Sequence, residues 1–212
     1  LELARLTGGR LHLLHVSTAG SVELIRRAKE RGIRVTAETC PHYCALTDAS
    51  LRTFDSNYKL NPPLRTQADV DALIAGLKDG TLDVLTSDHS PQAPEKKLRE
   101  LDQAPFGIIG LETLLPIAIA ALVTPGHLTW PQFIEKLTLR PARVLGIGRG
   151  TLKVGADADV TIIDPEAEWT IDVAKFASKS RNSPFHGLRV RGRAHLSIVG
   201  GEVKENPLQA QG

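Results

Sequence analysis

Two patterns of apolar and polar positions alternate along the first part of the chain. Continuous apolar runs, typical of strands buried on both faces, are separated by stretches whose apolar residues recur at helical spacing. The expected strands cover residues 11–17, 33–39 and 82–87, and the expected helices cover residues 21–31 and 66–78. Gly32 and Gly80 mark the ends of these helices. Strand and helix in alternation, with short connections, predict parallel βαβ units with right-handed crossovers.

The pattern changes in the second part of the chain. Residues 89–110 are too rich in proline, glycine and charge to form core, and a loop of this length is typically a lid or a binding loop. Helices are expected over residues 111–123 and 130–145. From residue 150 onward, short apolar strands separated by turns predict a small β-rich unit. These expected strands are 158–163, 169–171, 188–190 and 194–199.

Composition and charge narrow the classes of protein. The 212 residues suffice for one domain or one and a half, and the 26 basic and 24 acidic residues are mixed along the chain, which argues against a nucleic-acid surface. No run approaches the ~18 apolar residues of a membrane helix. Two cysteines cannot build a disulfide framework, and no secretory signal is visible, so a cytoplasmic enzyme domain is expected. Methionine is absent, including at position 1, and we expect the chain to begin inside something larger.

Two residues at the ends of expected strands are candidates for chemistry. On the first strand, His15 shares a face with Leu13 and Ser17 near the carboxyl edge, where α/β barrels carry their active sites. A core histidine bonded to the backbone is the alternative. Asp88 follows the strand over 82–87, and a carboxylate there is costly to bury unless it is paired or bound to metal. It could serve as a metal ligand and general base, or simply cap a turn.

Three further segments carry weaker signals. Residues 40–44 (CPHYC) suggest a metal knuckle, but they lack the usual cysteine spacing, which favours buried thiols. Asn61 is held by two prolines beside Arg65 and could recognise a planar polar ligand or a carboxylate, or form a rigid strand exit. Phe106 and Gly107 lie where the backbone could approach a ligand, or where a lid could hinge.

Eight motifs along nearly the whole chain together resemble one family. They are HVST (15–18), AETCPHY (37–43), LNPPLR (60–65), DVLTSDHSP (83–91), PFGIIGLET (105–113), RPARVLGI (140–147), GTLKVGADADVTIID (150–164) and SRNSPFHG (180–187). In this order the chain resembles the dihydroorotases of the amidohydrolase superfamily, in the longer form related to hydantoinases and allantoinases. The resemblance implies an α/β fold. Residues 1–149 would form the C-terminal part of a (β/α)8 barrel, and residues 150–212 a small β-rich composite domain with a C-terminal tail.

The resemblance also implies a site built around one or two zinc ions. His15 matches a metal-ligating histidine, and Asp88 matches the aspartate that is both metal ligand and catalytic acid and base. His42 is not expected to be a ligand, because related hydantoinases carry glutamine there. The family's His-x-His strand, its bridging lysine or aspartate and its third histidine lie before the HVST strand and are not in this chain. We therefore expect a C-terminal half that is inactive alone and binds zinc weakly.

The same resemblance assigns the substrate contacts. Asn61 matches an asparagine that contacts the substrate, and Phe106 with Gly107 matches the loop that closes over the ring. Gln92 stands where the family uses a histidine to meet the substrate carboxylate, which weakens the substrate assignment.

The activity implied is the reversible zinc-dependent cyclisation of N-carbamoyl-aspartate to dihydroorotate in pyrimidine biosynthesis. The alternatives are an allantoinase or hydantoinase, or a non-catalytic scaffold for aspartate carbamoyltransferase. Partners are accordingly the small-molecule substrate, a second copy of the chain and, as a candidate, that carbamoyltransferase. No nucleic-acid or membrane partner is expected.

Overall fold

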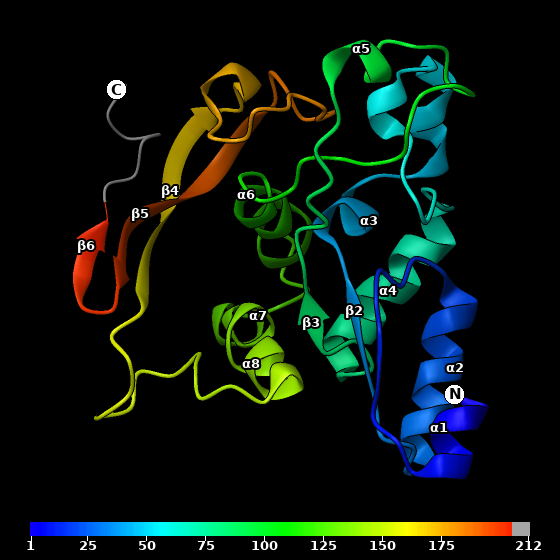
Figure 1. Ribbon diagram of the computed structural model, residues 1–212, viewed down its shortest axis with the longest axis vertical. Coiled ribbons are helices and arrows are strands. Elements are labelled where there is room, and N and C mark those ends of the chain that lie inside the picture. Colours follow the sequence, from blue (N-terminus) through cyan, green and yellow to red (C-terminus); the bar gives the residue numbers. More distant parts are fainter. Residues whose placement is uncertain (205–212) are drawn as a thin grey trace.

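A three-stranded parallel sheet covered by helices forms the first half of the protein (Figure 1). The computed structural model describes residues 1–204. The strands are β1 (Leu11–Leu13), β2 (Val35–Thr39) and β3 (Val84–Leu85), in the order β1-β2-β3. The crossover helices α2 (Ala19–Glu30) and α4 (Gln67–Asp79) pack against each other beside the sheet. The predicted parallel βαβ units are confirmed.

The remaining helices are short. They are α1 (Glu2–Thr7), α3 (Pro41–Ala45), α5 (Pro94–Lys97), α6 (Leu114–Ala118), α7 (Trp130–Leu137) and α8 (Leu139–Leu145). The 3₁₀ helices η1 (Asp48–Thr53), η2 (Ser56–Tyr58) and η4 (Val173–Lys175), and the π-helix η3 (Ile119–Val123), complete the set in residues 1–204. The helix predicted over residues 130–145 breaks at Thr138, whose φ of −126° and ψ of −78° are not helical. Pro141 explains the break, because its ring would clash with the carbonyl of Leu137 in a continuous helix.

The C-terminal part is an antiparallel sheet of long strands, where the sequence predicted short ones. It contains β4 (Val160–Thr170), β5 (Arg189–Val199) and β6 (Glu202–Lys204) in the order β4-β5-β6. The two strands predicted over 158–163 and 169–171 are joined in β4, and those predicted over 188–190 and 194–199 are joined in β5. Asp164 and Pro165 lie between the first two of these predicted strands, where a turn was expected, and are instead absorbed in a register shift between Asp164 and Glu168.

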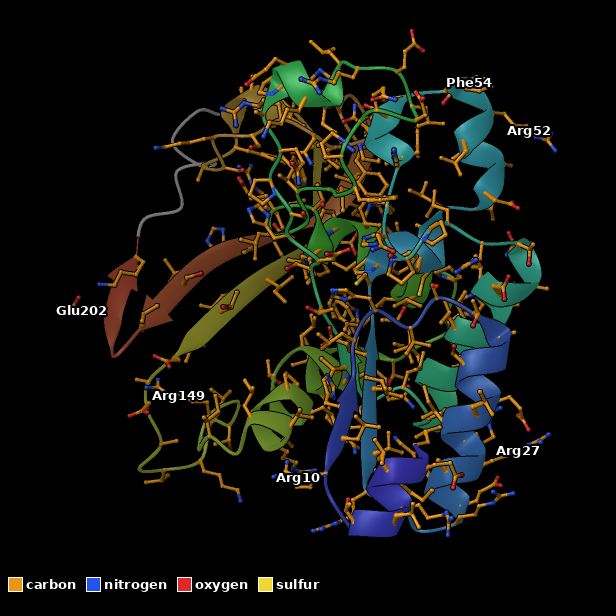
Figure 2. All side chains as sticks on the ribbon, turned by 45° about the vertical axis from the view of Figure 1, so that its right-hand side comes forward. Arg10, Arg27, Arg52, Phe54, Arg149 and Glu202 are labelled. Carbon is orange, nitrogen blue, oxygen red and sulfur yellow. The ribbon has the colours of Figure 1, made fainter. Side chains whose placement is uncertain are left out.

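One buried apolar cluster runs through both parts of the chain. It contains sheet and helix residues such as Ile25 and Leu73, and also Ile171, Phe176 and Phe185 from the C-terminal part. Figure 2 shows side chains crowded between the parallel sheet and its helices, while the end of the antiparallel sheet near Glu202 stands away from them. The division at residue 150 stays a prediction. Within residues 1–204, no helix has the length and apolar character that crossing a bilayer requires.

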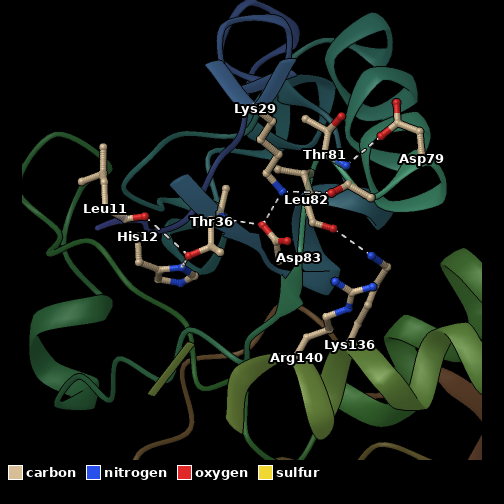
Figure 3. Close-up of polar contacts among 12 residues, drawn as sticks. Leu11, His12, Lys29, Thr36, Asp79, Thr81, Leu82, Asp83, Lys136 and Arg140 are labelled. Carbon is tan, nitrogen blue, oxygen red and sulfur yellow. Dashed lines mark hydrogen bonds and ion pairs between the residues drawn. The ribbon is translucent and has the colours of Figure 1, made fainter. Parts of the chain in front are cut away.

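Polar contacts of Lys29, Asp83 and Lys136 join helices α2 and α7 to the amino-terminal side of β3 (Figure 3). Lys29 Nζ lies 2.7 Å from Asp83 Oδ2, which also accepts a hydrogen bond from the Ala37 backbone at 2.9 Å. Lys136 Nζ donates to the Leu82 carbonyl at 2.7 Å. Burial lowers the pKa of Lys136 to about 8, against the opposing effect of Asp83. This end of the sheet therefore serves stability, as is usual for the amino-terminal side of barrel strands.

The buried ammonium of Lys136 predicts a specific pH dependence of stability. Its pKa is lower in the folded chain than the ~10.4 of an unfolded lysine, so above about pH 8 the folded state releases the proton first and stability rises with pH. We expect the unfolding free energy of the wild type, minus that of Lys136→Met, to increase by about 1–2 kcal/mol between about pH 7 and pH 9.5. Urea denaturation of both proteins measures it. Two parallel stability profiles would contradict the assignment.

Gly110 allows the loop after α5 to lie against the end of β3. A Cβ at position 110 would lie 1.8 Å from the Ser87 carbonyl oxygen, so the backbone beside Asp88 would have to move. We expect Gly110→Ala to lower the unfolding free energy by at least about 1–3 kcal/mol, as overpacking does. Gly20→Ala is the control, because nothing lies within 4 Å of its added Cβ and alanine favours the helix by up to ~1 kcal/mol. Equal stability of the two variants would show that the contact is not tight.

Candidate metal centre

The carboxyl ends of the three parallel strands bring polar side chains to one point. His15 follows β1, His42 follows β2 in the first turn of α3, and Asp88 follows β3. His15 Nε2 lies 3.7 Å from Asp88 Oδ1, and His42 Nε2 lies 3.7 Å from Asp88 Oδ2. The predicted meeting of His15 and Asp88 at the sheet edge is therefore seen in the structure. Both histidines present Nε2 to the same carboxylate.

Left-handed backbone turns aim two of these side chains. His15 has a φ of 52° and Asp88 a φ of 49°, a region that residues other than glycine seldom adopt and that occurs often at functional sites. The strand predicted over 11–17 accordingly ends at Leu13, and the regular alternation expected for Leu13, His15 and Ser17 is wrong. Pairing with β2 resumes only at Val16, whose backbone donates to the Glu38 carbonyl at 2.9 Å. The intervening bend turns His15 toward Asp88.

His42 was not expected to be a ligand, but the structure places it among the donor atoms beside Asp88. It is 2% exposed, and its Nε2 has no hydrogen-bond partner. Burial lowers the pKa of His42 to about 3, so the imidazole is neutral, which is the form that binds metals. A buried nitrogen without a partner, facing a carboxylate, is the strongest sign of a ligand position in the described residues. Its place directly after a strand, behind Pro41, is the sequence signal that could have found it.

Cys40 completes a compact group of donors. One ligand atom each from Cys40, His42 and Asp88 lie within 4.8 Å of one another. The Cys40 sulfur also lies 3.6 Å from His15 Nδ1, and burial raises the pKa of its thiol well above the usual value. Burial likewise raises the pKa of the Asp88 carboxyl, against the effect of His15. Imidazole nitrogen and carboxylate oxygen are ligands that zinc takes, so His42 and Asp88 fit zinc, whereas burial favours the neutral thiol of Cys40.

Glu38 contacts two histidines, His15 and His12, with its two carboxylate oxygens. Its Oε1 is 3.3 Å from His15 Nδ1, and its Oε2 is 3.1 Å from His12 Nε2. The hydrogen bond between Glu38 and His15 is the main reason that the pKa of His15 is raised. Burial opposes ionisation of Glu38, but the bonds from His15 and His12 lower its pKa on balance. A carboxylate on Nδ1 fixes the ring of a ligating histidine and leaves Nε2 for the metal. The sequence reasoning assigned neither Glu38 nor His12 a role.

The expected substrate contacts lie on the loops around the group. Gln92 Nε2 donates to the Phe106 carbonyl at 3.1 Å, and the backbone of Gln92 donates to Asn182. Phe106 is half exposed, with Lys59 Nζ 4.9 Å above its ring. Within residues 1–204, the exposed Asn61 side chain makes no hydrogen bond. The structure therefore brings Gln92 and the Phe106 loop together, while the role of Asn61 stays a prediction.

Parallel strands that carry imidazoles and a carboxylate at their carboxyl ends are typical of α/β barrels, which place their functional sites at this edge. Residues 4–204 match the Amidohydrolase family, and the chain belongs to it. It is 54% identical over 201 residues to a dihydroorotase of Pelotomaculum thermopropionicum and 51% identical over 201 residues to one of Acetivibrio thermocellus. Each alignment covers 95% of this chain and 47% of the relative, so the chain spans about half the length of these relatives.

Solved structures agree with this placement. The L-hydantoinase (dihydropyrimidinase) of Arthrobacter aurescens superposes with a TM-score of 0.90 at 35% identity, over 95% of this chain and 46% of that protein. A dihydropyrimidinase of Brevibacillus agri gives 0.89 at 31% identity, with the same coverage. The predicted α/β fold and the resemblance to dihydroorotases are confirmed.

The orphaned nitrogen of His42 predicts a contribution to metal binding. We expect His42→Ala to weaken zinc binding to this chain at least as much as loss of an outer partner of a ligand, which costs ~10–100-fold. His127→Ala is the control, since His127 lies outside the donor group. Isothermal titration with zinc measures both. Unchanged affinity in His42→Ala would remove His42 from the ligand set.

Proposed function

We propose that this chain supplies His15, His42 and Asp88 to the zinc site of a dihydroorotase. The reaction is the reversible opening of dihydroorotate to N-carbamoyl-aspartate, which in the cyclising direction serves pyrimidine biosynthesis. The observation that carries the proposal is the unpartnered Nε2 of His42 facing Asp88 at the carboxyl edge of a parallel sheet. The chain is 51% and 54% identical to two proteins named dihydroorotase, which supports the choice of substrate.

In this proposal Asp88 moves the proton. Zinc, when bound, lowers the pKa of a coordinated water to ~7 and so supplies a nucleophile at neutral pH. Asp88 accepts the proton released as the amide carbonyl is attacked, and returns it to the departing ring nitrogen. Burial raises the pKa of the Asp88 carboxyl in the chain without metal, and the charge of a bound zinc would oppose this shift. His15, fixed by Glu38, presents Nε2 to the same carboxylate.

The loops supply the substrate contacts in the same proposal. Asn61 offers an unpaired amide, and the backbone at Phe106 and Gly107 lies near the segment after Asp88. Gln92 Nε2 donates to the Phe106 carbonyl at 3.1 Å and to Ser90 Oγ at the longer distance of 3.5 Å, so the N–H on Ser90 is the one that would turn to the substrate carboxylate. A neutral amide binds a carboxylate less strongly than a charged partner does, by about 1 kcal/mol.

Two alternative functions are less well supported. A hydantoinase or allantoinase would use the same donor group, and the structural neighbours are hydantoinases, but their identity of 35% and 31% is below the 54% found with a dihydroorotase. A non-catalytic scaffold for aspartate carbamoyltransferase has no need of the aligned His15, His42 and Asp88. Self-association of the chain is a further part of the proposal.

Replacing Asp88 should affect turnover more than binding. In the gene product that contains this chain, we expect Asp88→Asn to lower kcat by ~10²–10⁴-fold, because the amide cannot take up the proton. Asp71→Asn, on the exposed side of α4, is the matched control. A dihydroorotate assay in both directions measures kcat and KM. A nearly normal kcat with only a changed KM would refute the role of Asp88.

A further inference from the structure

We infer that Asn182 is a positioning residue that clamps the segment after Asp88 to the loop of Phe106 and Gly107. This inference rests on the proposed function. Asn182 lies in the segment between η4 and β5 and is 4% exposed, although its side chain is fully polar. A buried polar side chain normally has hydrogen-bond partners. The partners of Asn182 lie on two separate loops beside the donor group, which indicates that its amide holds these loops together.

The carboxamide of Asn182 bonds to both loops at once. Its Nδ2 donates to the Ser90 carbonyl at 3.0 Å and to the Gly107 carbonyl at 3.1 Å. Its Oδ1 accepts from the Gln92 backbone N–H at 3.1 Å. The backbone carbonyl of Asn182 accepts from the Ile109 backbone N–H at 3.0 Å. Both N–H donors of the side chain are therefore used. The bonds of the carboxamide reach 75 to 92 residues back along the chain.

The two loops approach too closely for a larger residue at position 107. A Cβ on Gly107 would lie 2.5 Å from Ser90 Oγ, and the φ of Gly107 is +126°, which favours glycine. Ser90 donates its backbone N–H to the Ile108 carbonyl at 2.7 Å across the same gap. At this contact, the carbonyls of Ser90 and Gly107 both accept hydrogen bonds from the Asn182 amide nitrogen.

Only a neutral planar amide of this length matches that place. An aspartate would set carboxylate oxygens against two carbonyl oxygens and supply no donor. An alanine would leave the two carbonyls and the Gln92 N–H without the partner that Asn182 supplies. The turn that presents Asn182 is itself held by Arg181, whose guanidinium donates to the carbonyls of Ser178 and Ser180.

The clamp matters for the reaction because of what lies next to it. Ser90 is two residues after Asp88, and Gly107 directly follows Phe106. Fixing Ser90 against Gly107 therefore fixes the proton-carrying carboxylate relative to the loop that covers the substrate ring. A displacement of ~1 Å at such a contact can cost ~10²-fold in rate. The C-terminal part of the chain thereby helps to set the geometry of the site.

Hydrogen exchange tests the clamp without any activity. In the 212-residue chain, we expect Asn182→Asp to speed exchange of the Ile109 and Ser90 amides at least about tenfold, with α4 unchanged. Asn57→Asp is the matched control, since the Asn57 side chain lines the same loop region but joins no two segments. Asn182→Ser, which keeps one donor without adding charge, should give an intermediate rate and replaces Asn182→Asp if that variant unfolds. Wild-type exchange at Ile109 and Ser90 would overturn the inference.

Kinetics of the gene product that contains this chain test the positioning role. We expect Asn182→Ser to lower kcat by about 10–100-fold, with KM changed much less and zinc affinity unchanged. A loosened loop with a normal kcat would overturn the positioning role. If the wild type turns over a hydantoin instead of dihydroorotate, the proposed substrate fails, and the same comparison on that substrate still decides the role of Asn182. The two failures are thus distinguishable.

Discussion

The convergence of parallel strands at one edge is the constraint on which the site depends. Because β1, β2 and β3 run in the same direction, the residues that follow them meet at one point even though they are far apart in sequence. The left-handed turns at His15 and Asp88 then direct both side chains inward, where Asp88 also meets His42. The unusual backbone occurs at the ligand candidates, as expected where a fold maintains an uncommon conformation for function.

The two ends of the sheet serve different purposes. At the amino-terminal side, the buried cluster of Lys29, Asp83 and Lys136 joins helices to strands and has its charges and donors engaged. At the carboxyl side, the imidazole of His42 is buried with an unpartnered nitrogen. An unsatisfied buried group costs about 1–3 kcal/mol, and such a group persists where a ligand can satisfy it. This contrast supports our proposal that the metal site lies at the carboxyl side.

Sequence reasoning reached the parts of the structure that depend on local pattern. The spacing of apolar residues and the glycines at the helix ends predict the βαβ units. The polar residues at the ends of expected strands predict that His15 and Asp88 lie at the same edge of the sheet. It did not expect His42 to be a ligand, because the absence of a partner for Nε2 is a property of the packed structure. It missed Glu38 for a similar reason, since its contact with two histidines depends on strand register. Asn182 lies 92 residues from one of its partners, beyond any pattern in the chain. The merging of short strands into β4 depends on a bulge that tolerates proline.

Zinc located by anomalous diffraction tests the central claim most directly. Crystals of the gene product that contains this chain, grown with zinc and measured at the zinc absorption edge, should show a peak ~2.0–2.2 Å from His42 Nε2 and from an Asp88 carboxylate oxygen. His15 Nε2 should lie beside the same peak. A fully occupied zinc peak elsewhere, with His42 Nε2 still unpartnered, would contradict the assignment of this sheet edge as the metal centre.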